Sequence, residues 1–272
     1  MEEAAERAVL RAIGAMRERL GEQLTVDDLA RAAMFSKFHF SRMFQRVTGV
    51  SPGRFLSALR LQKAKHLLVS TTMSVADISV HVGYNSVGTF SSRFSRSVGM
   101  SPTTYRRRAG YAPVIPIDTE NRAGRPSNAR LACRVRLAQP DDNAVIFVGM
   151  FADRIPEGRP VRCSVLRQGD RIQFDQVPVG TWYVLAQSVT QDACHPVADC
   201  ECIDRPVSVG TYGPFTVRPD AVISVDLVLQ PSRVLDPPVL LALLDVRKYA
   251  MAQLDGARYA RPPYLDGAAA VA

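Results

Sequence analysis

The 272-residue sequence predicts a multidomain protein of mixed α and β class: an all-α N-terminal domain with a duplicated helical unit, followed by an antiparallel β-sandwich with a terminal helix. First, residues 40–52 (FSRMFQRVTGVSP) recur fifty positions later as 90–102 (FSSRFSRSVGMSP), and such a repeat indicates one supersecondary unit used twice. Second, residues 1–110 carry 17 Arg and Lys against 8 Asp and Glu, whereas the remaining residues carry 17 against 18. Third, short segments beyond residue 130 alternate apolar and polar residues between turn signals.

Two helices joined by a turn are predicted in each copy, one helix-turn-helix over 26–49 and the other over 75–99. Each second helix starts after a serine N-cap and ends at a glycine suited to the left-handed conformation. The turn is one residue longer in the second copy. A helix over 2–20 supports the core, and a helix over 52–70 links the copies, so that residues 1–109 form one domain.

The distribution of charge favours nucleic acid as the partner of this domain. Residues 29–108 contain 13 basic residues and a single acid, Asp77, and clustered positive charge is what phosphate neutralisation needs. The linker helix spans roughly 28 Å at the usual rise per residue, close to the roughly 34 Å turn of B-DNA. The sequence therefore predicts two readers in successive major grooves of double-stranded DNA.

Residues from about 4 to 108 resemble the DNA-binding domain of the AraC/XylS family of transcriptional regulators. The resemblance is carried by LARAAMFSKFHFSRMFQRVTGVSPGRFL, by the linker LRLQKAKHLLVS and by ISVHVGYNSVGTFSSRFSRSVGMSPTTYRR. The positions matching the family pattern in the second copy are Ile78, Gly83, Tyr84, Ser86, Phe90, Ser91, Phe94, Arg96, Gly99, Ser101, Pro102, Tyr105 and Arg106. Ser79 stands where the family favours alanine. The resemblance implies a sequence-specific transcription regulator that works with RNA polymerase.

The family register, together with the core periodicity, assigns the DNA contacts. Base-edge contacts are expected from Phe38, Ser41, Arg42, Gln45, Val87, Gly88, Thr89 and Ser92. Phosphate contacts are expected from Ser36, Lys37, Arg46, Ser86, Arg93, Arg96 and Arg106. An arginine fork suits guanine and a glutamine suits adenine, whereas the second reader has no long polar side chain. We therefore expect stronger base discrimination from the first copy.

The C-terminal half is predicted as a linker over 110–128, a β-sandwich over 129–232, and a helix and tail over 233–272, the helix at 238–250. The expected strands are 131–137, 144–151, 160–167, 170–176, 181–189, 205–217 and 221–229. The stretch RIQFDQVPVGTWYVLAQSV resembles the strand-turn-strand of transthyretin-like and carboxypeptidase-regulatory-like sandwiches. The AraC resemblance implies that this domain senses a small-molecule effector or forms a homodimer. In most members of the family the DNA-binding module is C-terminal, whereas here it precedes the second domain.

Four residues in one predicted loop have the chemistry of metal ligands: Cys194, His195, Cys200 and Cys202. Thiolates and imidazole are ligands of zinc and copper(I), so a metal-responsive regulator is one alternative; redox sensing and an ordinary loop are others. No other cofactor is expected.

An enzyme fused to the DNA module is a further alternative. It is not favoured, because Cys133 and Cys163 have no histidine nearby and the sequence has no nucleophile elbow and no Gly-rich phosphate loop. The start at Met1 has no signal-peptide pattern, and no apolar run is long enough to span a bilayer, so a cytoplasmic location is expected.

Overall fold

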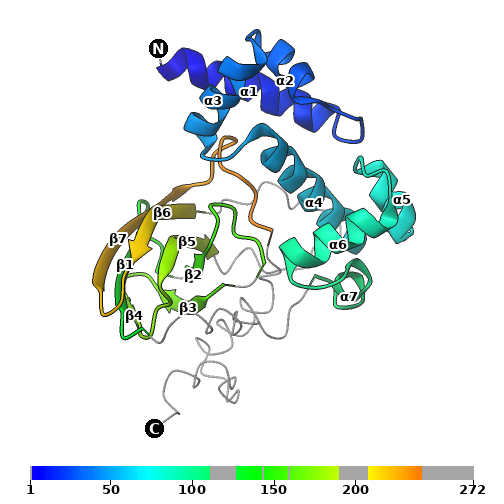
Figure 1. Ribbon diagram of the computed structural model, residues 1–272. Helices are drawn as coiled ribbons and strands as arrows, with labels where there is room; N and C mark the ends of the chain where they lie inside the picture. The colour runs from blue at the N-terminus through cyan, green and yellow to red at the C-terminus, as the bar shows by residue number, and fades with distance from the viewer. Residues whose placement is uncertain (1, 111–126, 143, 159, 190–207, 241–272) are drawn as a thin grey trace. The chain divides into compact units, whose positions relative to one another are not determined.

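The structure, a computed structural model, describes residues 2–110, 127–142, 144–158, 160–189 and 208–240 (Figure 1). The chain forms two compact units: a helical unit of Met1–Gly110 with Arg233–Leu241, and a sheet unit of Tyr111–Ser232 with Ala242–Ala272. Among the described helices, none combines the length and the apolar character needed to cross a membrane.

The helical unit confirms the predicted all-α N-terminal region. Its helices are α1 (Glu2–Glu18), α2 (Val26–Ala33), α3 (Lys37–Thr48), α4 (Pro52–Ser70), α5 (Val75–His81), α6 (Val87–Val98) and α7 (Pro102–Arg107). In Figure 1, α4 runs between the group α1–α3 and the group α5–α7. The helices α2–α3 and α5–α6 are the two copies of the repeated unit.

Aromatic side chains form an equivalent core in each copy. In the first copy, Phe40 and Phe44 of α3 contact each other, and Phe44 also contacts Phe55 of α4. In the second copy, Phe90 and Phe94 of α6 contact each other, and Phe94 also contacts Tyr105 of α7. Five of these rings are fully buried, and Tyr105 is nearly so. Val47 of α3 is only half-buried although it lies at helical spacing from Phe40 and Phe44, and Met43 is buried beside these phenylalanines.

The described residues of the sheet unit form a seven-stranded sheet in the order β3-β2-β5-β6-β7-β1-β4. The strands are β1 (Arg130–Leu137), β2 (Val145–Phe151), β3 (Arg162–Arg167), β4 (Arg171–Phe174), β5 (Gly180–Val189), β6 (Ser208–Val217) and β7 (Val222–Pro231). Strands β1 and β7 pair in parallel over their full length, so the predicted purely antiparallel sandwich is not confirmed. Alternation predicts a strand and its buried face, but it does not reveal the neighbour or its direction. The terminal strands of the order, β3 and β4, are joined by a tight turn, so the sheet is nearly closed.

The stretch that resembles transthyretin-like domains spans β4 and β5, which are not paired with each other. Strand β4 pairs with β1, whereas β5 lies between β2 and β6. The connection between them is held by Trp182, whose Nε1 donates to the Pro178 carbonyl at 2.8 Å. The resemblance to those sandwiches therefore stays a prediction.

The segment after β7 returns to the helical unit. Within residues 233–241, Leu235 and Leu240 are buried, and the Lys65 ammonium of α4 donates to the Leu240 carbonyl at 2.9 Å. No helix begins at residues 238–240, and the rest of the predicted helix 238–250 lies outside the described residues.

Candidate nucleic-acid interface

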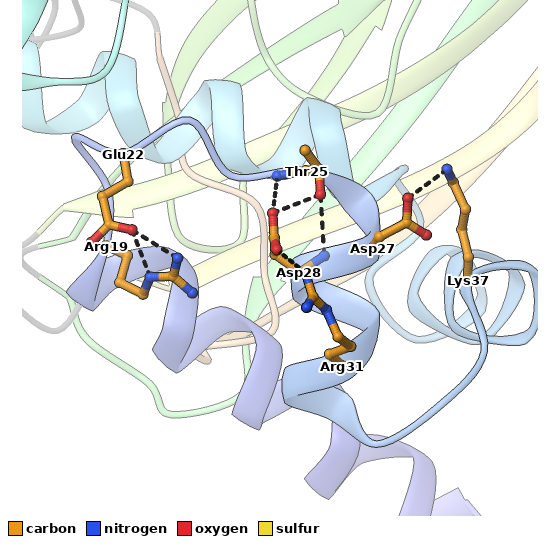
Figure 2. Close-up of polar contacts among 7 residues, drawn as sticks. All are labelled: Arg19, Glu22, Thr25, Asp27, Asp28, Arg31 and Lys37. Atoms are coloured by element: carbon orange, nitrogen blue, oxygen red, sulfur yellow. Dashed lines mark hydrogen bonds and ion pairs between the residues drawn. The ribbon is translucent and has the colours of Figure 1, made fainter.

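The start of α2 is fixed by side chains that precede and follow it (Figure 2). Thr25 and Asp28 form a full capping box: the Asp28 amide donates to the Thr25 hydroxyl, and the Asp28 carboxylate accepts from the Thr25 amide. Hydrogen bonds from Thr25 lower the pKa of Asp28 below its usual value. An ion pair of 2.9 Å between Asp27 and Lys37 then joins α2 to the first turn of α3.

The outer face of α3 presents the residues predicted to read bases. Phe38, Arg42 and Gln45 are exposed, and their spacing of four and three residues places them on one side of the helix. Phe38 is 80% exposed, which is unusual for so large an apolar side chain. Ser41 lies beside them, half-buried, and its hydroxyl donates to the Lys37 carbonyl at 2.8 Å. The structure thus brings all four predicted readers of the first copy together.

The outer face of α6 is exposed too, but its side chains are short. The exposed positions include Val87, Gly88, Thr89 and Ser92. The Ser86 hydroxyl accepts from the Thr89 amide and donates to the Thr89 hydroxyl, so both hydroxyls take part in the N-cap. None of these four side chains has the planar fork that Arg42 has on α3.

The residues predicted to contact phosphate differ in how free their polar groups are. Arg46 and Arg96 are exposed, Arg93 is half-buried, and Ser36 makes no capping hydrogen bond of the kind Ser86 makes. Lys37 is engaged with Asp27, but an exposed ion pair is worth little and can exchange for a phosphate.

Arg106 has a different role from the others. Its Nε donates to the Leu68 carbonyl at 3.0 Å, and its Nη2 donates to the Met73 carbonyl at 2.6 Å. The half-buried guanidinium therefore anchors α7 to the end of α4, and only its remaining N–H groups are left for a phosphate.

Two other arginines, Arg11 and Arg60, also donate hydrogen bonds to backbone carbonyls at helix ends, which the sequence did not predict. Arg11 donates to the Ala33 carbonyl where α2 ends, and Arg60 donates to the Leu20 and Glu22 carbonyls after α1. Carbonyls at helix C-termini lack intrahelical partners and favour cations. A share of the positive charge is therefore structural.

The cysteine alternatives find no support in the part of the chain that the structure describes. The predicted ligands Cys194, His195, Cys200 and Cys202 lie outside the described residues. Burial raises the pKa of Cys133 to about 11 and that of Cys163 to about 12, so neither thiol has the low pKa of a reactive nucleophile. The described ranges contain no group of three His, Cys, Asp or Glu that could hold a metal ion.

Comparison with known proteins gives matches to the helical unit. A family model described as a helix-turn-helix domain matches residues 29–108, which include both copies from Leu29 on. An uncharacterized HTH-type transcriptional regulator of Haemophilus influenzae is 42% identical over 82 residues, covering 30% of this chain and 28% of that protein. The HTH-type transcriptional activator AarP of Providencia stuartii is 31% identical over 100 residues, covering 36% of this chain and 74% of AarP.

A solved transcriptional regulator from Chromobacterium violaceum, of the AraC-type DNA-binding-domain proteins, is 27% identical with a TM-score of 0.37, covering 38% of this chain and 93% of that chain. The chain spans about three tenths of the length of the first curated relatives it matches. The match to AarP, by contrast, takes in most of that protein. With both copies matched and the aromatic core and caps in place, the chain belongs to the AraC family of helix-turn-helix transcriptional regulators.

Proposed function

We propose that the chain is a sequence-specific, double-stranded DNA-binding transcription regulator whose helices α3 and α6 enter successive major grooves. The observation that carries this proposal is the outer face of α3, where Phe38, Arg42 and Gln45 are exposed while Phe40 and Phe44 of the same helix are fully buried. A helix that displays an arginine, a glutamine and an aromatic ring together suits guanine, adenine and thymine edges in a major groove.

The two helices are proposed to do different work. Arg42 and Gln45 have the donors and acceptors for bidentate contacts, so α3 would supply most of the base discrimination. The short side chains of α6 bring the helix close to the duplex, where Arg93 and Arg96 would contact phosphate. Phosphate contacts fix position and orientation but carry no sequence information directly.

A comparison of Arg42→Ala with Arg96→Ala on a panel of single-base operator variants tests this proposal. Arg42→Ala should cost about 1–3 kcal/mol on the preferred site and flatten the preference at one base pair. Arg96→Ala removes an equal charge, so it should weaken binding to every sequence alike and reduce the salt slope by about one. An equal loss on all sequences from Arg42→Ala would refute its role as a base reader.

The sheet unit is proposed to sense a small-molecule effector or to mediate homodimer formation, and RNA polymerase is the proposed protein partner. The proposal of RNA polymerase as partner is supported by the relative AarP, which is named a transcriptional activator. The proposed role of the sheet unit is supported by the family resemblance of the helical unit and by the presence of a second compact unit with its own apolar core. Fluorescence-based screening of ligands against the full chain, read through Trp182 in β5, tests the effector role.

A further inference from the structure

The loop that follows α1 lies against the turn that precedes α6, and the side chain of Arg60, from α4, is hydrogen-bonded to that loop. We propose that three parts together form a clamp between the two helix-turn-helix copies: the 20–23 loop, Arg60 and the 83–85 turn. The clamp fixes the orientation of α6 relative to α3 and thereby sets the spacing of half-sites that the protein accepts. The functional part of this inference rests on the proposed DNA binding.

Direct hydrogen bonds hold the loop to the turn. The Gln23 amide nitrogen donates to the Gly83 carbonyl at 3.2 Å and to the Asn85 side-chain oxygen at 2.8 Å. From α4, the Arg60 Nε donates to the Leu20 carbonyl at 3.1 Å, and its Nη2 donates to the Glu22 carbonyl. The loop is therefore tied to the second copy by Gln23 and to the linker helix by Arg60.

Two glycines let the backbones approach too closely for any side chain. A Cβ on Gly21 would lie 2.7 Å from the His81 carbonyl oxygen, at the end of α5. A Cβ on Gly83 would lie 2.8 Å from the Leu20 carbonyl oxygen and 2.7 Å from Nη2 of Arg60. Real Cβ contacts are not that short, so the 20–23 loop and the second copy each place a glycine against the backbone of the other. Close approach from both sides indicates a fitted contact.

Arg60 serves the clamp and is poorly placed to serve as a phosphate ligand. Its guanidinium is half-buried among the loop carbonyls, and this burial lowers its pKa from the usual value. Lys63, one turn further along α4, makes no such contact among the described residues and has the same charge. The two residues therefore separate the effect of the clamp from the effect of charge.

The clamp can control the orientation of α6 relative to α3 because of the elements to which its two ends are attached. On one side, the loop continues α1, and α1 packs against both α2 and α3. On the other side, the 83–85 turn leads directly into Ser86, the N-cap of α6. Without the clamp, α4 would be the main connection between the copies, and rotation about it would change the distance between the reading faces.

The test uses the full-length protein and a series of operators in which one or two base pairs are inserted between the half-sites. One inserted base pair turns the second half-site by roughly a tenth of a turn, which a rigid protein cannot follow. We expect the wild-type protein to lose affinity steeply at each insertion. The double variant Gln23→Met, Arg60→Met should reduce that penalty by about fivefold or more, the equivalent of about one hydrogen bond. The matched variant Lys63→Met should leave the ratio between spacings unchanged.

A second readout does not depend on DNA. Spin labels carried by non-natural amino acids at Gln45 on α3 and Ser92 on α6, both exposed, report the distance between the helices in the free protein. The distribution should be narrow in the wild-type background and broader in the clamp variant. Unchanged distances together with an unchanged spacing penalty overturn the clamp. If the wild-type protein binds no operator, the proposed function fails, and the distance distributions alone decide whether the clamp exists.

Discussion

Gly83→Ala is expected to destabilise the helical unit by more than the equivalent change at another left-handed glycine, Gly99→Ala. Both residues have positive φ, +85° at Gly83 and +92° at Gly99, so alanine is strained at either position. That strain costs about 1–2 kcal/mol in each case. The surroundings differ, because a Cβ on Gly99 meets nothing within 4 Å, whereas a Cβ on Gly83 meets the Leu20 carbonyl oxygen and Arg60 at 2.8 and 2.7 Å.

The close approach at Gly83 must be relieved by movement of the loop backbone or of Arg60. Overpacking of this kind costs about 1–3 kcal/mol, so the total for Gly83→Ala is about 2–5 kcal/mol against about 1–2 kcal/mol for Gly99→Ala. Urea unfolding followed by far-UV circular dichroism measures the helical unit, while the fluorescence of Trp182 reports the sheet unit. Equal losses for the two alanine variants would show that the loop does not press on Gly83.

Two further outcomes follow from burial. Leu240→Ala truncates a side chain that is 1% exposed and should lower the free energy of unfolding of the helical unit by about 2–4 kcal/mol. Val234→Ala, at a position that is 47% exposed, should change that free energy by less than about 0.5 kcal/mol. Urea unfolding compares the two variants, and equal effects would show that the 233–241 segment is not part of the core of the helical unit. Cys133 and Cys163 should react slowly with a thiol-alkylating reagent at pH 8, because their pKa values of about 11 and about 12 keep the thiols protonated. The alkylation rate should rise about tenfold per pH unit below those pKa values. Peptide mapping identifies the modified cysteines, and labelling of the folded protein as fast as in urea would contradict the burial of the two thiols.

The helices were predictable because the signals that define them are local. Thr25 and Asp28 lie three residues apart and cap the same turn, and Ser86 caps a residue three positions on. The core phenylalanines repeat at helical spacing, so that the outer face of α3 is found by elimination. The assignment of Phe38, Arg42 and Gln45 to an exposed face therefore needs only the period of a helix.

The contacts that position the two copies were not predictable, because they join residues far apart in the chain. Arg60 and Arg106 each count as one positive charge in the sequence, yet each donates to carbonyls that lie 33 to 40 residues away. In the sequence, an arginine that donates to carbonyls at a helix end cannot be distinguished from an arginine that contacts a phosphate. The parallel pairing of β1 with β7 was not predictable for a similar reason, since it joins residues about ninety positions apart.

The two copies are alike in scaffold and differ in what surrounds their turns. In the first copy, Met34 takes the left-handed position and its side chain is 80% exposed. In the second, Gly83 holds the same position against the 20–23 loop, and the additional turn residue, Asn85, accepts the hydrogen bond from Gln23. The one-residue difference between the copies thus supplies a contact of the clamp. The turn that is held precedes α6, the helix with the shorter side chains on its outer face, as expected if α6 contributes to specificity through where it lies on the duplex.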